Sequence, residues 1–280
     1  MFGSHLSIAG GLHLAVQAAG QLGMETVQVF NKNQRQWRVP PLTDEAIVQW
    51  REECRRVGLA AAVSHDSYLI NLASPDELIR RKSMDLCCIE HQRCEALGIP
   101  LLVMHPGSHV GDGESKGIAR IVQGLNRAHA ATAGATLTCL EITAGQGSSI
   151  GWRLEHLVEI ILKVKHPERV AVCLDTAHLF AAGYDFRGRK YQSFCREVER
   201  TVGLDRVKVW HLNDSKRELG SRVDRHEHIG RGTIGLDGFR PIVRDRRWRG
   251  VPKILETEKG SAPDGRQWDA VNLQALRTLM

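Results

Sequence analysis

The run RVAVCLDTAH, from Arg169 to His178, decides the fold expected for this chain of 280 residues. Its continuous apolar centre is typical of a strand that is buried on both faces of a parallel sheet. Two polar side chains, Asp175 and His178, follow at the end of the run. The pattern therefore predicts a buried parallel strand that delivers polar side chains to one end of a sheet.

Seven further runs repeat this pattern along the chain. They are FGSHLS (2–7), TVQVF (26–30), LAAAVSHD (59–66), PLLVMHPG (100–107), TLTCLEIT (136–143), RVKVWHLND (206–214) and PKILETE (252–258). Segments with helical spacing lie between them, most clearly at 10–23, 43–58, 76–98 and 152–165. Eight such units in roughly 250 residues predict a (β/α)8 TIM barrel, one domain over residues 1–280. An open doubly wound sheet is the alternative, but no GxGxxG follows the first strand.

Composition limits the class of protein and the compartment. Seven cysteines without a CxxC pair indicate free thiols in a reducing cytoplasm rather than a disulfide framework. The N-terminus does not resemble a signal peptide, and no uncharged apolar run reaches the ~18 residues of a membrane span. The formal net charge of +6 fits either an ordinary soluble protein or one with a polyanionic partner. No interface stripe is visible, so a monomer is the default expectation.

Metal-capable side chains end most of the predicted strands. In a barrel the carboxyl ends of the strands converge on one mouth, so these side chains should meet there. Burying several carboxylates together without cations is costly, and divalent metals are the natural compensation. Imidazoles mixed with carboxylates suit zinc, manganese or iron. The candidate ligands are His65, His105, Glu141, Asp175, His178, His211, Asp224, His226 and Glu256.

Nine ligands are too many for one ion, which takes about four. They predict two or three metals with one bridging carboxylate, and clusters of this kind commonly cleave phosphate esters. The loop GSRVDRHEHIGRG (220–232) fits this chemistry, because Asp224 and His226 alternate on an extended segment and can point the same way. They could hold a metal with His178. Its arginines at 222, 225 and 231 would lie beside an anionic substrate, although a solvated charged turn would look similar.

Eight motifs run in one order along nearly the whole chain. They are NKNQRQW (31–37), HDSYLINLASP (65–75), HPGSH (105–109), TAGQGSSIG (143–151), CLDTAH (173–178), HLND (211–214), GSRVDRHEHIGRG (220–232) and ILET (254–257). In this order they resemble the endonuclease IV family, the zinc-dependent apurinic/apyrimidinic (AP) endonucleases of the xylose-isomerase-like barrel superfamily. The series as a whole is very specific.

The resemblance implies three Zn²⁺ ions. His65, His105 and a bridging Glu141 would hold the first; Glu141, Asp175, His211 and Glu256 the second; His178, Asp224 and His226 the third. Manganese or iron could occupy one position. Glu141 and Glu256 are the expected catalytic carboxylates, with Glu256 also orienting or deprotonating the attacking water. The expected substrate is duplex DNA with abasic sites or blocked 3′ ends, cut 5′ to the lesion to leave a 3′-hydroxyl.

Arg35, Tyr68 and Leu69 match the positions that the family inserts into DNA at the lesion. An arginine, an aromatic ring and an apolar wedge can fill the gap left by a missing base. Unstacking is easiest where pairing is already lost, so damage itself supplies selectivity. The basic run RDRRWRG (244–250) and Lys32 could add phosphate contacts, or could be exposed faces.

Two departures and two other hypotheses remain. The family usually has Asn where Ile142 follows Glu141, and a Pro-containing segment where Thr257 to Gly260 follows Glu256. Ile142 should point away from the metals because a strand alternates its faces. A metal-dependent sugar isomerase or epimerase on the same barrel is the alternative enzyme, but it would not need the 220–232 or 31–37 loops. A non-catalytic DNA-damage binder would have lost metal ligands, and none is lost here.

Overall fold

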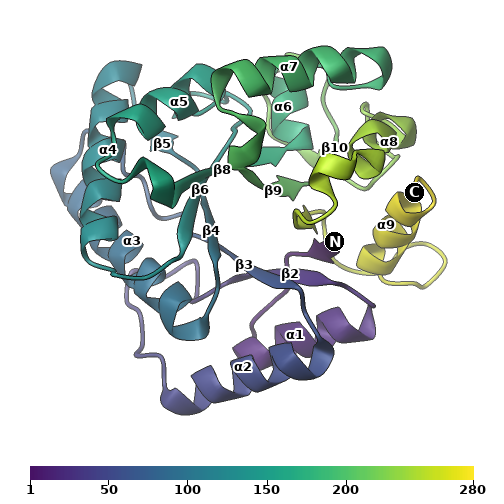
Figure 1. Ribbon diagram of the computed structural model, residues 1–280, viewed down its shortest axis with the longest axis horizontal. Coiled ribbons are helices and arrows are strands. Elements are labelled where there is room, and N and C mark those ends of the chain that lie inside the picture. Colours follow the sequence, from purple (N-terminus) through teal and green to yellow (C-terminus); the bar gives the residue numbers. More distant parts are fainter.

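Eight parallel strands form one sheet that curls into a barrel in the computed structural model, which describes residues 1–280. Helices surround the strands on the outside (Figure 1). Around the sheet the strands run β1 (Phe2–Ser4), β12 (Lys253–Leu255), β9 (Val207–His211), β8 (Val170–Asp175), β6 (Leu137–Glu141), β4 (Leu101–Met104), β3 (Ala61–His65) and β2 (Thr26–Phe30). Each of the eight predicted runs contains one of these strands, which confirms the TIM barrel.

The barrel closes between its first two strands. A Cβ on Gly3 would lie 2.1 Å from the carbonyl oxygen of Thr26, so only glycine allows β1 to approach β2 this closely. One residue beyond β1, His5 forms a parallel bridge with Gln28, and the Leu6 amide donates to the Gln28 carbonyl at 2.8 Å. Closure leaves few unpaired strand edges and brings the ends of all eight strands around one opening.

The helices confirm the four segments whose spacing predicted them. Thr43 and Asp76 accept hydrogen bonds as N-caps of α2 and α3, and Gly58 and Gly98 end these helices in the left-handed conformation. None of the helices is long and apolar enough to cross a membrane. The α-helices are α1 (Leu12–Gln21), α2 (Asp44–Val57), α3 (Glu77–Leu97), α4 (Glu114–Ala130), α5 (Leu154–Lys163), α6 (Thr176–Ala182), α7 (Tyr191–Thr201), α8 (Leu236–Arg244) and α9 (Trp268–Arg277). Short 3₁₀ turns are η1 (Pro167–Arg169), η2 (Gly188–Lys190), η3 (Leu204–Arg206) and η4 (Arg246–Trp248).

The apolar core has two layers. The larger layer lies between strands and helices and holds 56 buried residues, among them Ile142. The smaller cluster is drawn from the other face of the strands and consists of Val63, Leu101, Val103, Cys139, Ala171, Cys173, Val209 and Ile254. Two cysteines thus serve as small apolar residues of the barrel interior. All seven cysteines are free thiols, as expected from the sequence.

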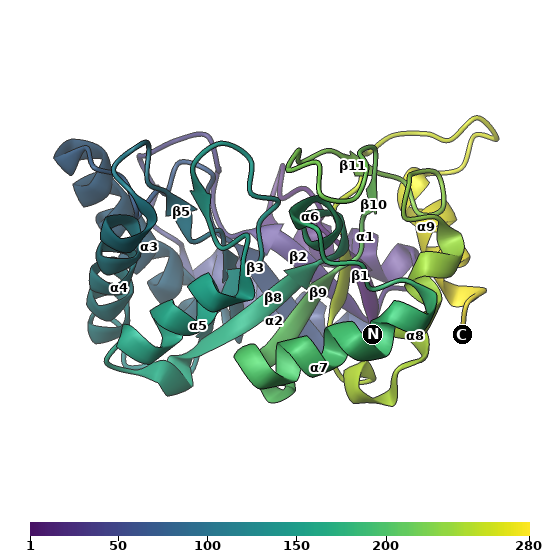
Figure 2. The same cartoon turned by 90° about the horizontal axis from the view of Figure 1, so that it is seen from above.

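Two small antiparallel ladders fix the loops at the carboxyl ends of the barrel strands. β5 (Gly107–Ser108) pairs with β7 (Ser149–Ile150), and β10 (Asp214–Ser215) pairs with β11 (His226–Glu227). Figure 2 shows β5, β10 and β11 along the upper edge of the molecule, above the barrel strands. Loops held at this mouth can position side chains over the strand ends.

Candidate metal centre

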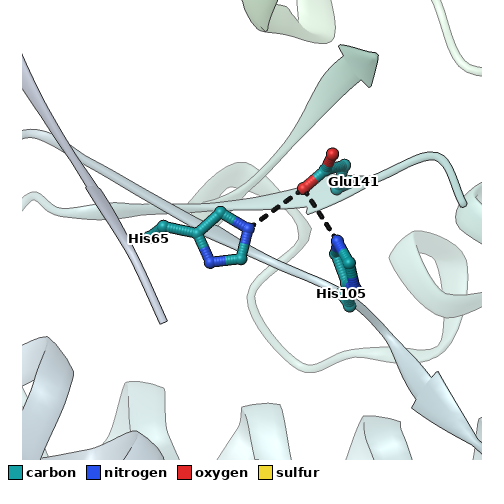
Figure 3. A group of neighbouring side chains, drawn as sticks. All are labelled: His65, His105 and Glu141. Atoms are coloured by element: carbon teal, nitrogen blue, oxygen red, sulfur yellow. Dashed lines mark hydrogen bonds and ion pairs between the residues drawn. The ribbon is translucent and has the colours of Figure 1, made fainter. Parts of the chain in front are cut away.

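Two histidines from neighbouring strands point at one oxygen of Glu141. His65 ends β3, His105 follows β4 and Glu141 ends β6. The Nε2 atoms of the two imidazoles lie 3.2 Å and 3.3 Å from Glu141 Oε2 (Figure 3). Ligand atoms of the three side chains all lie within 4.8 Å of one another, a spacing at which one ion could contact all three.

The other oxygen of Glu141 faces a second group of ligands. His211 Nδ1 lies 3.1 Å from Glu141 Oε1 and 3.0 Å from Glu256 Oε2. Asp175 Oδ2 is 3.9 Å from the same nitrogen. Since one oxygen of Glu141 faces each group, its carboxylate has the position of a bridge between two metals.

The third group joins α6 to the loop at 220–232. His178 Nε2 lies 3.2 Å from Asp224 Oδ2, and His226 Nε2 lies 3.3 Å from Asp224 Oδ1. Asp175 also approaches this group, with Oδ2 3.8 Å from His226 Nε2. Its Oδ1 accepts from the His178 amide as the N-cap of α6, which fixes the carboxylate between the second and third groups. The structure thus brings together all nine predicted ligands.

Hydrogen bonds to backbone carbonyls orient two of the histidines, as is usual for histidine ligands of metals. One nitrogen of His65 donates to the Asp66 carbonyl, and one nitrogen of His178 donates to the Ile142 carbonyl, each at 2.9 Å. The second nitrogen of each ring then faces the carboxylates, where a bound cation would take the place of a proton. Nε2 of His226 is buried and makes no well-directed hydrogen bond, although Asp224 Oδ1 lies 3.3 Å away. An orphaned imidazole nitrogen among carboxylates fits a divalent cation.

The charges of the centre compensate one another only in part. Burial alone would raise the pKa of Glu141, but His211 and His105 hold it well below its usual range. Burial alone would lower the pKa of His65, but the hydrogen bond to Glu141 raises it to about 9. Because metal ions replace protons on such ligands, the same carboxylates that attract these protons would favour bound cations.

Two buried residues outside the predicted ligand set, Gln28 and Asn213, support the ligands together with the partly buried His5, which lies in the first predicted run. Gln28 donates to Glu256 Oε1 at 2.6 Å and accepts from His211 Nε2 at 2.9 Å. Asn213 donates to Asp175 Oδ2 at 2.6 Å and accepts from the Glu256 amide at 2.8 Å. His5 Nδ1 lies 3.3 Å from Glu256 Oε1. The available signal was a glutamine inside the apolar run TVQVF and an asparagine two residues after a strand-end histidine.

Replacing Gln28 by Met is expected to weaken metal retention by roughly 10- to 100-fold, the usual effect of losing a residue that orients metal ligands. Met fills a similar volume but can neither donate to Glu256 nor accept from His211. The measurement is metal per chain after dialysis against graded chelator. Gln28→Glu, which keeps an acceptor for His211, should retain more metal. Equal retention by Gln28→Met and the unaltered protein would show that Gln28 does not orient the ligands.

Two of the three predicted DNA-contacting residues, Arg35 and Tyr68, line a cavity beside the centre. This cavity of about 620 Å³ is lined by His5 and Glu256 on one side and by Arg35 and Tyr68 on the other. The Tyr68 side chain is large and apolar yet 65% exposed. Its ring meets Phe30 edge-on, with centroids 5.4 Å apart. Leu69 follows and is partly buried.

The arginines of the 220–232 loop are spread around the mouth. Arg222 stacks on Trp152, with its guanidinium carbon 4.0 Å from the ring centroid, and Arg231 lies 4.6 Å from the Trp268 ring. Arg225 lines a smaller cavity of about 270 Å³ with His178 and Asp224. The metal centre therefore has an open cavity on each side, and a cation near each.

Two basic features that could have contacted phosphates, the 244–250 run and Lys32, do not lie exposed at the mouth of the barrel. The run at 244–250 precedes β12, and Arg247 and Trp248 line a cavity with Ala61 and Leu101, which begin barrel strands. This is the end of the barrel opposite the mouth. Lys32 is buried rather than exposed. Neither feature is therefore placed to contact DNA held at the metal centre.

Comparisons with known proteins agree with this geometry. A family model described as a xylose isomerase-like TIM barrel matches residues 16–279. A curated relative from Geobacter sulfurreducens, named probable endonuclease 4, is 48% identical over 280 residues, which are 99% of this chain and 94% of the relative. The chain belongs to the endonuclease IV family. Members of this family are DNA-cleaving hydrolases, and the chain is accordingly an enzyme of the hydrolase class.

Some solved structures resemble this chain in both sequence and fold, and others resemble it in fold alone. The crystal structure of endonuclease IV from Thermus thermophilus matches with a TM-score of 0.87 and 36% identity, covering 99% of this chain and 98% of that one. A D-psicose 3-epimerase from Clostridium cellulolyticum matches with a TM-score of 0.68 but only 16% identity, over 99% and 98% of the chains. The epimerase likeness concerns the barrel alone.

One of the two departures from the endonuclease IV pattern, Ile142, contributes to the centre through its backbone. The Ile142 side chain is fully buried in the layer between strands and helices, as the alternation of faces predicts. Its carbonyl accepts from His178 Nδ1. A backbone acceptor does not depend on the side chain, so the exchange of Asn for Ile leaves the orientation of His178 intact.

Proposed function

We propose that the protein is a metal-dependent AP endonuclease that hydrolyses the phosphodiester 5′ to an abasic site in duplex DNA and leaves a 3′-hydroxyl. One observation carries the proposal: nine candidate ligand side chains, Asp224 among them through its pairs with His178 and His226, converge at the barrel mouth beside an exposed tyrosine, Tyr68. Blocked 3′ ends carry the same kind of phosphate ester, so the same site would also trim them.

The ligand groups support three zinc ions. We assign them to His65, His105 and Glu141; to Glu141, Asp175, His211 and Glu256; and to His178, Asp224 and His226. Imidazole and carboxylate ligands without cysteine also accept manganese or iron, and one position could hold either. When bound, such ions lower the pKa of water and neutralise charge on a phosphate ester.

Side chains of the protein would position the attacking water and the DNA backbone. Glu256 is the one carboxylate that belongs to the ligand set and also lines the larger cavity, so we assign it acceptance of the proton from the attacking water. Gln28 and Asn213 hold Glu256 from both its side chain and its backbone. Arg225 and Lys259 stand in the two cavities, where they would attract the DNA backbone.

An incision assay tests the proposal. The substrate is an end-labelled duplex with one abasic analogue, the control is the intact duplex, and metal per chain is measured on the same sample. We expect a single cut 5′ to the lesion and about three metals per chain, as the ligand count implies. Absence of the cut, with one or two metals and turnover of a small ketose, would contradict it and favour an epimerase.

A further inference from the structure

A buried ion pair lies beneath the two loops that carry Arg35 and Tyr68. Lys32 Nζ lies 3.8 Å from Glu90 Oε1, and the two side chains are 2% and 0% exposed. The second oxygen of Glu90 has no hydrogen-bond partner. A buried pair that is incompletely compensated is a weak source of stability. What the pair holds in place is therefore a better guide to its role.

Lys32 holds the loop that follows β2. Its ammonium group donates to the carbonyls of Asn33 at 2.8 Å and Gln36 at 2.9 Å, which lie on either side of Arg35 in the chain. The Arg35 amide donates to Asn33 Oδ1 at 3.0 Å. The backbone that carries Arg35 is thus folded around the end of Lys32.

Glu90 holds the loop that follows β3. Its Oε1 accepts from the Ser67 amide at 3.2 Å. The Ser67 hydroxyl donates to the Gln34 carbonyl at 2.7 Å and accepts from the Leu69 amide at 3.3 Å. One carboxylate on α3 therefore ties the backbone beside Tyr68 and Leu69 to the loop that carries Arg35.

We propose that Lys32 and Glu90 are positioning residues for lesion recognition, which fix Arg35 relative to Tyr68 and Leu69 before DNA binds. This inference rests on the proposed function, since it assumes that the three side chains enter the DNA at the lesion. Loops that are ordered in advance lose less conformational freedom on binding. The pair would thereby favour binding of damaged DNA without touching it.

The test replaces both charges, because removing one alone would leave the other buried and unpaired. The double variant Lys32→Met/Glu90→Met is compared with Asp85→Asn/Arg127→Met, which removes an exposed pair between the same helix α3 and α4. KM is measured for incision of abasic duplex, and intact duplex is used as a competitive inhibitor to give Ki. Trypsin nicking after the exposed Arg35 and Arg38 reports the order of the first loop without DNA.

We expect the Lys32/Glu90 variant to be nicked faster and to show a KM about 10-fold higher or more, with kcat and Ki within about 3-fold, as for loss of preorganisation. The control pair should change none of these. Unchanged nicking and KM, or an equal loss for abasic and intact duplex, would overturn the positioning role. A different result would overturn the proposed function instead: the variant is nicked faster, but the unaltered protein itself shows no preference for abasic over intact duplex.

A milder variant keeps the inference testable if the double variant does not fold. Ser67→Ala leaves both buried charges in place and removes only the hydroxyl link between the two loops. It should raise KM for abasic duplex by a smaller factor than the double variant does, and it should leave Ki for intact duplex unchanged. No change in the ratio of KM to Ki would count against the link.

Discussion

Replacing Glu256 by Gln is expected to reduce incision of abasic duplex by about 10³-fold or more, as loss of one member of a catalytic unit does. The exchange keeps the volume of the side chain, so the packing at the mouth should survive. It removes the negative charge that faces His211 Nδ1 at 3.0 Å. It also leaves a single oxygen where two now face His211 and accept from the Gln28 amide, the latter at 2.6 Å. The neutral amide cannot accept the proton from water and is a weaker metal ligand.

The measurement compares single-turnover incision, metal content and the affinity for intact duplex. Glu258→Gln is the matched control, because Glu258 is exposed two residues further on and should tolerate the same exchange. We expect the Glu256 variant to keep its unfolding temperature and its affinity for intact duplex. Turnover close to that of the unaltered enzyme would refute the role assigned to Glu256.

The convergence of the candidate ligands could be predicted because the barrel topology determines where the strand ends lie. His65, Glu141, Asp175 and His211 each end a barrel strand, and parallel strands that close into a barrel bring these ends together. Only the residue type and its place in the apolar run were needed. Distances in sequence did not matter, since each strand contributes one side chain to the same mouth.

Residue type alone does not distinguish a ligand histidine from a structural one. His91 and His129 are as deeply buried as His65, His178 and His211. Both of their rings nevertheless surround the Thr138 hydroxyl, at 2.8 Å and 2.9 Å, in the layer outside the barrel. Neither ring forms an ion pair with a carboxylate, and burial lowers the pKa of His91 to about 4. Position relative to the strand ends is what separates the two kinds of site.

Lys32 shows what the sequence could not supply. A lysine in a polar loop is usually exposed, and its buried partner Glu90 lies on a helix far along the chain. Similarly, the arginines of the 244–250 run precede a strand rather than follow one, which places them at the opposite end of the barrel from the DNA. Both interpretations depended on local composition, whereas a distant buried partner decides the place of Lys32 and the direction of the following strand decides the place of the 244–250 run.

Replacing Tyr68 and Leu69 together by Ala is expected to raise KM for abasic duplex by about 10- to 100-fold, since removing an aromatic ring that stacks on a base costs about 1–3 kcal/mol. Tyr68 is held ready for contact, because its ring is exposed but braced by Phe30 and His65, with centroids 5.4 Å and 5.7 Å away. Intact duplex offers no gap for the ring, and its binding relies on phosphate contacts, so its Ki should change little.

The controls separate lesion recognition from general DNA binding. Tyr68→Phe keeps the ring and should retain most of the preference for abasic duplex. Leu162→Ala removes another exposed apolar side chain, 77% exposed near the end of α5, and should alter neither constant. An equal loss on abasic and intact duplex would mean that Tyr68 and Leu69 support the mouth rather than enter the lesion. Selectivity would then have to come from the metal centre, which could accept only a backbone already distorted by the missing base.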